Sequence, residues 1–115
     1  MSPLFHPQIE DVPLAAVLHA LSDPVRVAIF SDIVASTSPR TCSNFLSVSD
    51  KPIPKSTLSQ HFKALREAGL IFSERHGVEM RNVSRCEEIN KRFPGLVPAI
   101  IQAHQVQLQG KAPAA

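Results

Sequence analysis

Residues 55–70, which read KSTLSQHFKALREAGL, decide the fold. In a helix, the spacing of Leu58, Phe62 and Leu65 brings these three side chains within about 60° of one another, so that they form one apolar stripe. Gly69 follows the stripe, and glycine is typical of the position just after a helix. The segment therefore predicts an amphipathic helix with one buried side.

The opposite side of this helix, which we expect over residues 55–68, carries hydroxyl, amide, imidazole and lysine groups instead of alternating Glu and Lys. Such groups donate and accept hydrogen bonds at base edges and phosphate oxygens, and they are small enough to lie in a major groove. A helix N-terminus also favours phosphate. The candidate DNA contacts on the helix are Lys55, Ser56, Thr57, Ser59, Gln60, His61, Lys63 and Arg66.

Three of these candidates have an alternative role in the structure of the protein itself. Ser56 is equally suited to capping the helix, and Arg66 to pairing with Glu67 or another acid. His61 lies beside the apolar stripe, where a histidine packed at the edge of the core is as good an interpretation as a base contact.

A change of hydrophobic period after Gly69 predicts a β-hairpin over residues 70–84, with its turn at His76-Gly77. Arg75, His76 and Arg81 lie near its tip and are further candidate DNA contacts. Residues 51–85 hold seven basic and three acidic residues, whereas the whole chain has a net charge of only +2. This concentration of positive charge favours a polyanionic partner.

The remaining chain reads as helices around this centre. Asp11 is the expected cap of the first helix, Asp23 that of the second, and Pro24 suits a first helical position. The second helix should bury Val25 and Ile29. A length of 115 residues suits one domain. The predicted fold class is mainly α with a small β-hairpin (α+β), with further helices near 11–21, 24–36, 41–48, 87–92 and 96–108.

Two stretches of sequence resemble the ArsR-type family of bacterial winged helix-turn-helix repressors. They are ALSDPVR at residues 20–26 and STLSQHFKALREAGLI at residues 56–71, and the match in helix order covers residues 10–108. The resemblance implies one winged helix-turn-helix domain over residues 1–115, with five to six helices. The helix-turn-helix would span 41–68 and a two-stranded wing 70–84, and a flexible tail would follow over 109–115.

The resemblance further implies a homodimeric repressor that reads a pseudo-palindromic operator in double-stranded DNA. Two-fold proteins of this kind read two half-sites about one helical turn apart. In that family the terminal helices, here 10–21 and 96–108, form the dimer interface. The candidate interface residues are Leu14, Val17, Leu18, Leu21, Leu96, Val97, Ile100, Ile101, His104 and Leu108.

The signal that such a repressor would sense is not evident. Relatives that bind metals carry a Cys-Val-Cys-Asp pattern, but this chain has Thr41-Cys42-Ser43-Asn44, and zinc needs four ligands. We therefore expect no metal and no cofactor. Cys42 and Cys86 are possible redox sensors, although a free cysteine is more often a small buried hydrophobe. An unknown small-molecule effector remains open.

Several function classes are excluded by absent patterns. The four glycines form no phosphate-binding loop and no nucleophile elbow is present, so we expect no enzyme. No run approaches the roughly 18 apolar residues of a membrane span, and no signal peptide is recognisable, so we expect a cytoplasmic protein. The alternative to a DNA-binding repressor is a winged-helix module that docks another protein.

Overall fold

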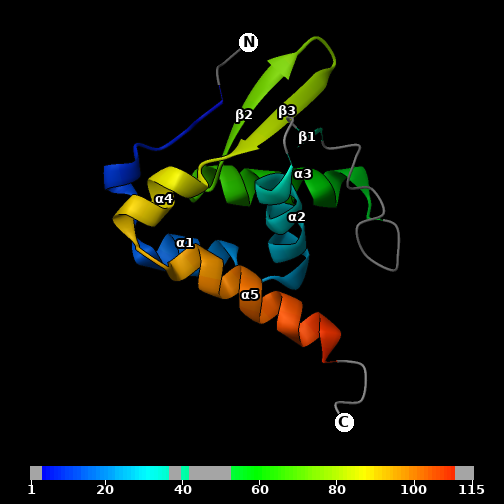
Figure 1. Cartoon of the computed structure of the whole chain (residues 1–115). Coiled ribbons are helices and arrows are strands. Elements are labelled where there is room, and N and C mark those ends of the chain that lie inside the picture. The colour runs from blue at the N-terminus through cyan, green and yellow to red at the C-terminus, as the bar shows by residue number, and fades with distance from the viewer. Residues whose placement is uncertain (1–3, 37–39, 42–52, 111–115) are drawn as a thin grey trace.

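Five α-helices and three β-strands form the part of the chain that the computed structural model describes, residues 4–36, 40–41 and 53–110. A 3-10 turn, η1 (Ile9–Asp11), precedes them. In chain order they are α1 (Leu14–Ala20), α2 (Pro24–Ala35), β1 (Arg40–Thr41), α3 (Lys55–Glu67), β2 (Ile71–His76), β3 (Glu79–Ser84), α4 (Cys86–Arg92) and α5 (Leu96–Gln109). The hairpin projects from one end of the molecule and α5 lies at the other, which confirms the α+β class (Figure 1).

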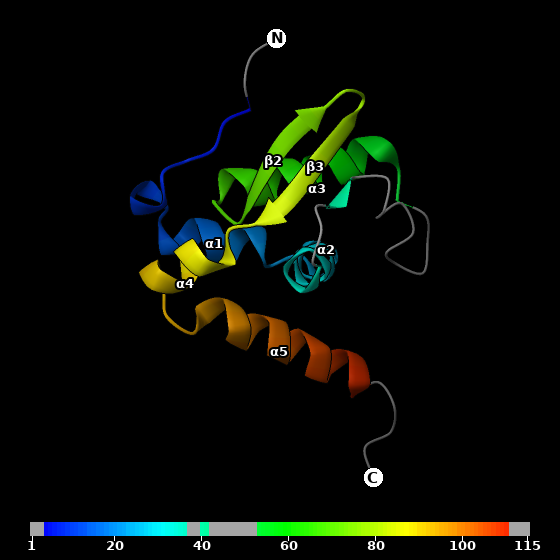
Figure 2. The same ribbon diagram turned by 45° about the horizontal axis from the view of Figure 1, so that its top comes forward.

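The core forms where α3 packs against α2. Leu58, Phe62 and Leu65 of α3 are at most 2% exposed, which confirms the predicted stripe. Helix α2 contacts α3, β3 and α5, and it lies between the hairpin and α5 in both ribbon views (Figure 2). Because α2 has neighbours on several sides, Val27 is buried as fully as Ile29, whereas Val25 is only half-buried.

The predicted helix starts are correct for α2 and wrong for α1. The side chain of Asp23 accepts a hydrogen bond from the backbone N–H of Val25 at 2.8 Å, as a cap should. Asp11 caps no helix, because it lies in η1 and α1 begins only at Leu14. Val12 separates the two elements in an extended conformation, with its side chain 2% exposed in the core.

The sheet has a third strand that the sequence did not predict. Arg40 and Thr41 form β1 and pair with Asn82 and Arg81 of β3, so Thr41 does not begin a helix as expected. A strand of two residues has no periodic signal that could reveal it. The rest of the predicted helix, residues 42–48, lies outside the described residues, as does the predicted tail from residue 111 on; residue 109 still belongs to α5.

The hairpin turn lies one residue later than predicted. His76 pairs with Glu79 at the end of the ladder, so Gly77 and Val78 make the turn. Gly77 adopts a φ of +64°, a conformation that glycine tolerates best.

The N-terminal segment packs along the open edge of this sheet. The strand order β1-β3-β2 leaves β2 at the edge, and the backbone N–H of Ser73 donates to Nε2 of His6 at 3.0 Å. The imidazole also stacks on the ring of Phe72, with 4.3 Å between the centroids. The backbone N–H of Ser73 is thus already bonded to His6 and is not available for pairing with another strand.

Two arginines fasten the same segment further along. Arg85 donates to the carbonyl of Pro7 at 2.9 Å, and Nε of Arg92 donates to the carbonyl of Val12 at 2.7 Å. The Val12 side chain packs directly over Gly69, which ends α3 in the left-handed conformation with a φ of +74°.

Among the described residues, no single helix has the length and apolar composition needed to cross a membrane. Helices α1 and α2 have this length and composition only when they are taken together, and the chain bends by 102° between them.

Substitution of Gly69 by alanine tests this packing, with Gly77→Ala as the matched control. Both glycines have positive φ, so both variants carry the backbone strain of about 1 kcal/mol. Only at Gly69 would the new Cβ lie 2.8 Å from a carbon of Val12, whereas nothing lies within 4 Å at Gly77. We expect Gly69→Ala to lose about 1–3 kcal/mol more free energy of unfolding in urea titrations. Equal losses would contradict the close packing.

A second prediction concerns pH. Burial, and then the charges of Arg66 and Arg85, lower the pKa of His6 below 6.5. The folded protein thus favours neutral His6, and between the two pKa values the unfolded chain binds more protons. Stability should therefore fall as pH drops below about 6.5. His6→Gln, which can still accept from Ser73 but does not titrate, should reduce this fall in urea midpoints. An unchanged pH profile in His6→Gln would contradict the prediction.

Candidate nucleic-acid interface

Helix α3 presents a continuous polar face away from its buried stripe. Six predicted contacts are all exposed on it: Lys55, Ser56, Thr57, Ser59, Gln60 and Lys63. Ser56 does not cap the helix, because Pro54 is the N-cap residue and α3 has no side-chain cap bond within the described residues. The N–H groups of the first turn and the positive end of the helix dipole lie at the end of α3 that carries Lys55, Ser56 and Thr57. The arrangement suits an anionic, hydrogen-bonding partner.

His61 does not share this face. It is 9% exposed, and its Nδ1 lies 3.4 Å from a guanidinium nitrogen of Arg26. Its position one turn after Leu58 turns the ring toward the protein interior, so the alternative interpretation as a histidine at the core edge is correct.

Arg66 also points toward the protein instead of away from it. It is half-buried, and its guanidinium lies 3.4 Å from the hydroxyl of Ser73 in β2. That hydroxyl donates to Oδ1 of Asn82 in β3 at 2.6 Å. Arg66 thus connects the end of α3 to the base of the hairpin, and the pairing with Glu67 considered from the sequence is not the contact it makes.

The three predicted contacts in the hairpin lie on two different faces. In the antiparallel ladder Arg81 is opposite Glu74 and His76 is opposite Glu79, whereas Arg75 is opposite Met80. Neighbouring residues of a strand point to opposite faces. Arg75 therefore faces away from Arg81 and His76.

The outer face of the hairpin tip contains its own counter-ions. Nε of Arg81 lies 3.6 Å from a carboxylate oxygen of Glu79, and His76 pairs with Glu74. All four side chains are at least 41% exposed, and such surface pairs contribute little and exchange readily for other partners. Arg75 forms no ion pair with any residue that the structure describes. The two carboxylates of the hairpin, Glu74 and Glu79, thus match its two guanidinium groups, Arg75 and Arg81, in number.

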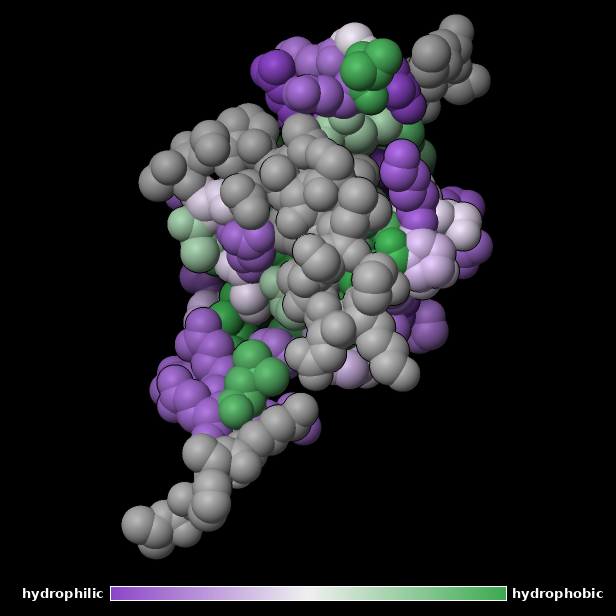
Figure 3. Space-filling model, turned by 90° about the vertical axis from the view of Figure 1, so that its right-hand side faces the viewer, coloured by the Kyte–Doolittle hydropathy of each residue, from purple (hydrophilic) through white to green (hydrophobic). Residues whose placement is uncertain are grey.

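Two hydrophobic surfaces flank this polar region at opposite ends of the molecule. Val78 in the hairpin turn is 98% exposed, and Val106 and Leu108 near the end of α5 are also exposed. Figure 3 shows a small green area among purple side chains at each end of the molecule. Val106 is not among the predicted interface residues, because it lies off the predicted apolar stripe of α5.

The ten residues proposed for a dimer interface divide into two groups. Val17, Leu21 and Val97 are at most 7% exposed within the single chain, so they are core residues and not available to a partner. The expectation for these three was wrong, because Val17 in α1, Leu21 at its C-cap and Val97 in the first turn of α5 all face the core of their own chain. The exposed or half-buried residues are Leu14, Leu18, Leu96, Ile100, Ile101, His104 and Leu108.

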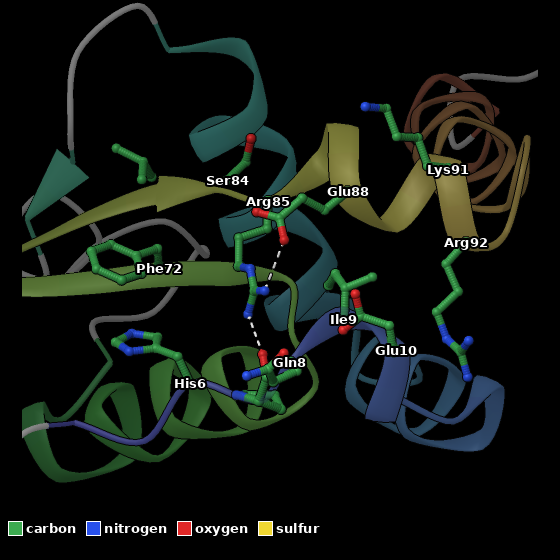
Figure 4. A pocket seen from close by; sticks show the side chains of 12 residues that line it. His6, Gln8, Ile9, Glu10, Phe72, Ser84, Arg85, Glu88, Lys91 and Arg92 are labelled. Atoms are coloured by element: carbon green, nitrogen blue, oxygen red, sulfur yellow. Dashed lines mark hydrogen bonds and ion pairs between the residues drawn. The ribbon is translucent and has the colours of Figure 1, made fainter.

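A groove of about 940 Å³ opens between the N-terminal segment, the hairpin and α4. Figure 4 shows Arg85 in its middle, bonded on one side to the N-terminal segment and on the other to Glu88 at 2.9 Å. The hydrogen bond from Arg85 lowers the pKa of Glu88. Because the central guanidinium is already paired with protein groups, Arg85 is not available to bind a ligand in this groove.

The cysteines give little support to redox sensing. Burial, and then the charge of Glu87, raise the pKa of the half-buried Cys86 thiol, so it lacks the thiolate character of a reactive cysteine. Cys42 lies outside the described residues. Across residues 4–36, 40–41 and 53–110, no three His, Cys, Asp or Glu side chains gather as a metal site would require.

Comparisons with known proteins agree with this geometry. A helix-turn-helix domain family matches residues 21–72. The HTH-type transcriptional regulator YceK of Bacillus subtilis (strain 168) is 42% identical over 94 residues, which cover 81% of this chain and 91% of YceK.

Two solved structures have a similar fold over nearly their whole length. An ArsR-like transcriptional regulator from Rhodococcus sp. RHA1 is 25% identical, with a TM-score of 0.57 over 89% of this chain and 94% of its own. Rv0081 of M. tuberculosis is also 25% identical, with a TM-score of 0.60 over 87% of this chain and 92% of its own.

Proposed function

Because the chain belongs to the ArsR-type family of winged helix-turn-helix transcriptional regulators, we propose that it is a homodimeric repressor of a pseudo-palindromic operator. Within a family of DNA-binding regulators, the observation that supports this specific role is the exposed face of α3. The hydroxyl, amide and amine groups there are exposed and form no hydrogen bond or ion pair with any side chain that the structure describes.

The side chains on this face fall into two chemical groups. The amide of Gln60 can bond to two atoms of an adenine edge, and the Ser and Thr hydroxyls can bond to any base. Lys55 and Lys63 are exposed ammonium groups that would neutralise phosphates. Gln60 would thus supply sequence preference, and the lysines would supply affinity for any DNA.

In this proposal the hairpin contacts the DNA backbone. Arg75 is exposed and unpaired within the described chain, so it can bind a phosphate without first giving up a protein partner. Arg81 must exchange the Glu79 carboxylate for a phosphate, which costs little at an exposed site.

The second copy would cover the outward side of α1 and the exposed part of α5. Leu14 and Leu18 are 45% and 46% exposed, although leucines of this size gain about 1.5–3 kcal/mol each on full burial. On α5, Leu108 is another exposed leucine, with 53% exposure. Pairing two chains here would leave both copies of α3 free to reach two half-sites. We further propose that it acts in the cytoplasm and has no metal site of the kind found in metal-sensing relatives.

The proposal is tested by fluorescence-anisotropy titrations in a salt series. The two duplexes are the DNA upstream of the protein's own gene and a scrambled version of it. We expect tighter binding to the upstream DNA, with an affinity that falls steeply as salt rises because phosphates release counterions. Absence of binding to either duplex at low salt would contradict the proposal and favour a protein-docking module.

Gln60→Ala should reduce discrimination between the two duplexes. Losing a bidentate base contact costs about 1–3 kcal/mol at the correct site and little elsewhere. Gln8→Ala is the matched control, since Gln8 is also exposed but lies in the N-terminal segment, just before η1. The same titrations measure both variants. If Gln60→Ala weakened binding to both duplexes equally, Gln60 would contact the backbone and not a base.

Leu18→Glu should weaken the dimer by about tenfold or more, because a carboxylate would replace a leucine that the second copy buries. Sedimentation equilibrium measures the dissociation constant of the dimer. Val78→Glu is the control, because Val78 is exposed at the opposite end of the molecule and should leave the dimer intact. A Leu18→Glu protein that remains as dimeric as the wild type would place the interface elsewhere.

A further inference from the structure

Arg26 joins three helices through one guanidinium group. Its Nε donates to the carbonyl of Ala20 at 2.6 Å, and a terminal nitrogen donates to the carbonyl of His19 at 3.4 Å. Both carbonyls belong to the end of α1, where the last carbonyls of a helix have no partner within it. The side chain is only 16% exposed, so these contacts are made mostly away from water.

The other side of the same guanidinium faces the start of α2 and the middle of α3. One terminal nitrogen lies 3.9 Å from a carboxylate oxygen of Asp23, the residue that caps α2, and 3.4 Å from Nδ1 of His61. A guanidinium can only donate, so Nδ1 of His61 must accept and the ring proton must be on Nε2. The contact therefore requires neutral His61 in one tautomer.

This contact reaches α3 at the centre of its exposed polar face. His61 follows Gln60 directly and precedes Lys63 by two residues, but its own ring points inward. The planar fork of an arginine holds several acceptors in a fixed relative geometry. A change in its contact with His61 would therefore rotate or shift the groups on the outer side of α3.

We infer that Arg26 is a positioning residue, which holds the exposed face of α3 in a fixed orientation relative to α1 and so sets operator affinity without touching DNA. This inference rests on the proposed function, because it assigns the role of the exposed α3 face to DNA binding. It also connects α1, the helix that we propose for pairing with a second copy, to α3.

The test compares Arg26→Lys with Arg92→Lys in the full-length protein. Both changes retain the charge and remove a guanidinium that donates through Nε to a backbone carbonyl. Only Arg26 also contacts α3, whereas Arg92 stacks over Phe93. We expect Arg26→Lys to bind the upstream duplex about tenfold more weakly, as the loss of a charged hydrogen bond would predict. Arg92→Lys should remain within about twofold of wild type.

The salt dependence separates positioning from direct contact. Because Arg26 neutralises no phosphate in this proposal, the slope of log affinity against log salt should be the same in Arg26→Lys and wild type. A flatter slope would show a phosphate contact and overturn the inference. An affinity within twofold of wild type would overturn it as well.

Two variants of His61 test the contact between Arg26 and His61 through the acceptor. This test can still be made if the Arg26→Lys protein does not fold. Asparagine can offer an acceptor oxygen near the place of Nδ1, whereas leucine cannot. We expect His61→Asn to retain more operator affinity than His61→Leu. We also expect His61→Leu and Arg26→Lys to be non-additive in a double-mutant cycle. Equal losses in the two His61 variants, or full additivity, would overturn the inference.

A measurement without DNA keeps this inference separate from the proposed function. In ¹H–¹⁵N NMR spectra, wild-type His61 should show an unprotonated Nδ1. Arg26→Lys should shift this nitrogen and the amide resonances along α3, while Arg92→Lys should shift resonances near α4. If wild type showed no preference for the upstream duplex, the proposed function would fail, and these spectra alone would decide whether Arg26 positions α3. Unmoved α3 resonances would overturn that role.

Discussion

Burial of one apolar stripe of α3 against α2 is the interaction on which the rest of the structure depends. Leu58, Phe62 and Leu65 are nearly inaccessible to water, and each contributes roughly 1.5–3 kcal/mol on burial. Their burial fixes the rotation of α3 about its axis, and hence which residues face outward. It also fixes where the chain leaves α3, since Gly69 turns directly from the packed helix into β2. The polar face and the hairpin therefore take their positions from the same hydrophobic contact.

Polar contacts then fasten the hairpin at its base and leave its tip free. Arg66 reaches Ser73 from α3, and His6 bonds to the backbone of that same serine from the N-terminal segment. Beyond Ser73 and Asn82 the hairpin residues are half-buried or exposed. A rigid base with an exposed tip suits a hairpin that contacts a partner alongside α3. Because its guanidinium contacts Ser73 at this base, Arg66 stabilises the position of the hairpin and is less available to bind a ligand.

The molecule separates its proposed tasks by position. The α3 face and the hairpin carry the polar and charged groups, whereas the outward side of α1 and the end of α5 carry exposed leucines. Arg26 lies between these regions and contacts α1 and α3 at once. Any movement of α1 against a second copy would reach α3 through this side chain. This connection is short, because the Arg26 side chain contacts both a carbonyl at the end of α1 and the His61 side chain of α3.

The local elements follow from the sequence alone: the stripe and polar face of α3, the Asp23 cap, the hairpin and the helices after the hairpin. These depend on periodicity and on capping or turn residues within a few positions, which a sequence displays directly. Only the tertiary structure decided that His61 and Arg66 point inward, that Val17, Leu21 and Val97 are core, and that Arg40 and Thr41 join the sheet. The local sequence around an apolar or basic residue is the same whether another element covers its side chain or leaves it exposed to water, so the local pattern cannot distinguish the two cases. That element comes from residues far away in the chain, as His6 does for Ser73 and Arg26 for His61.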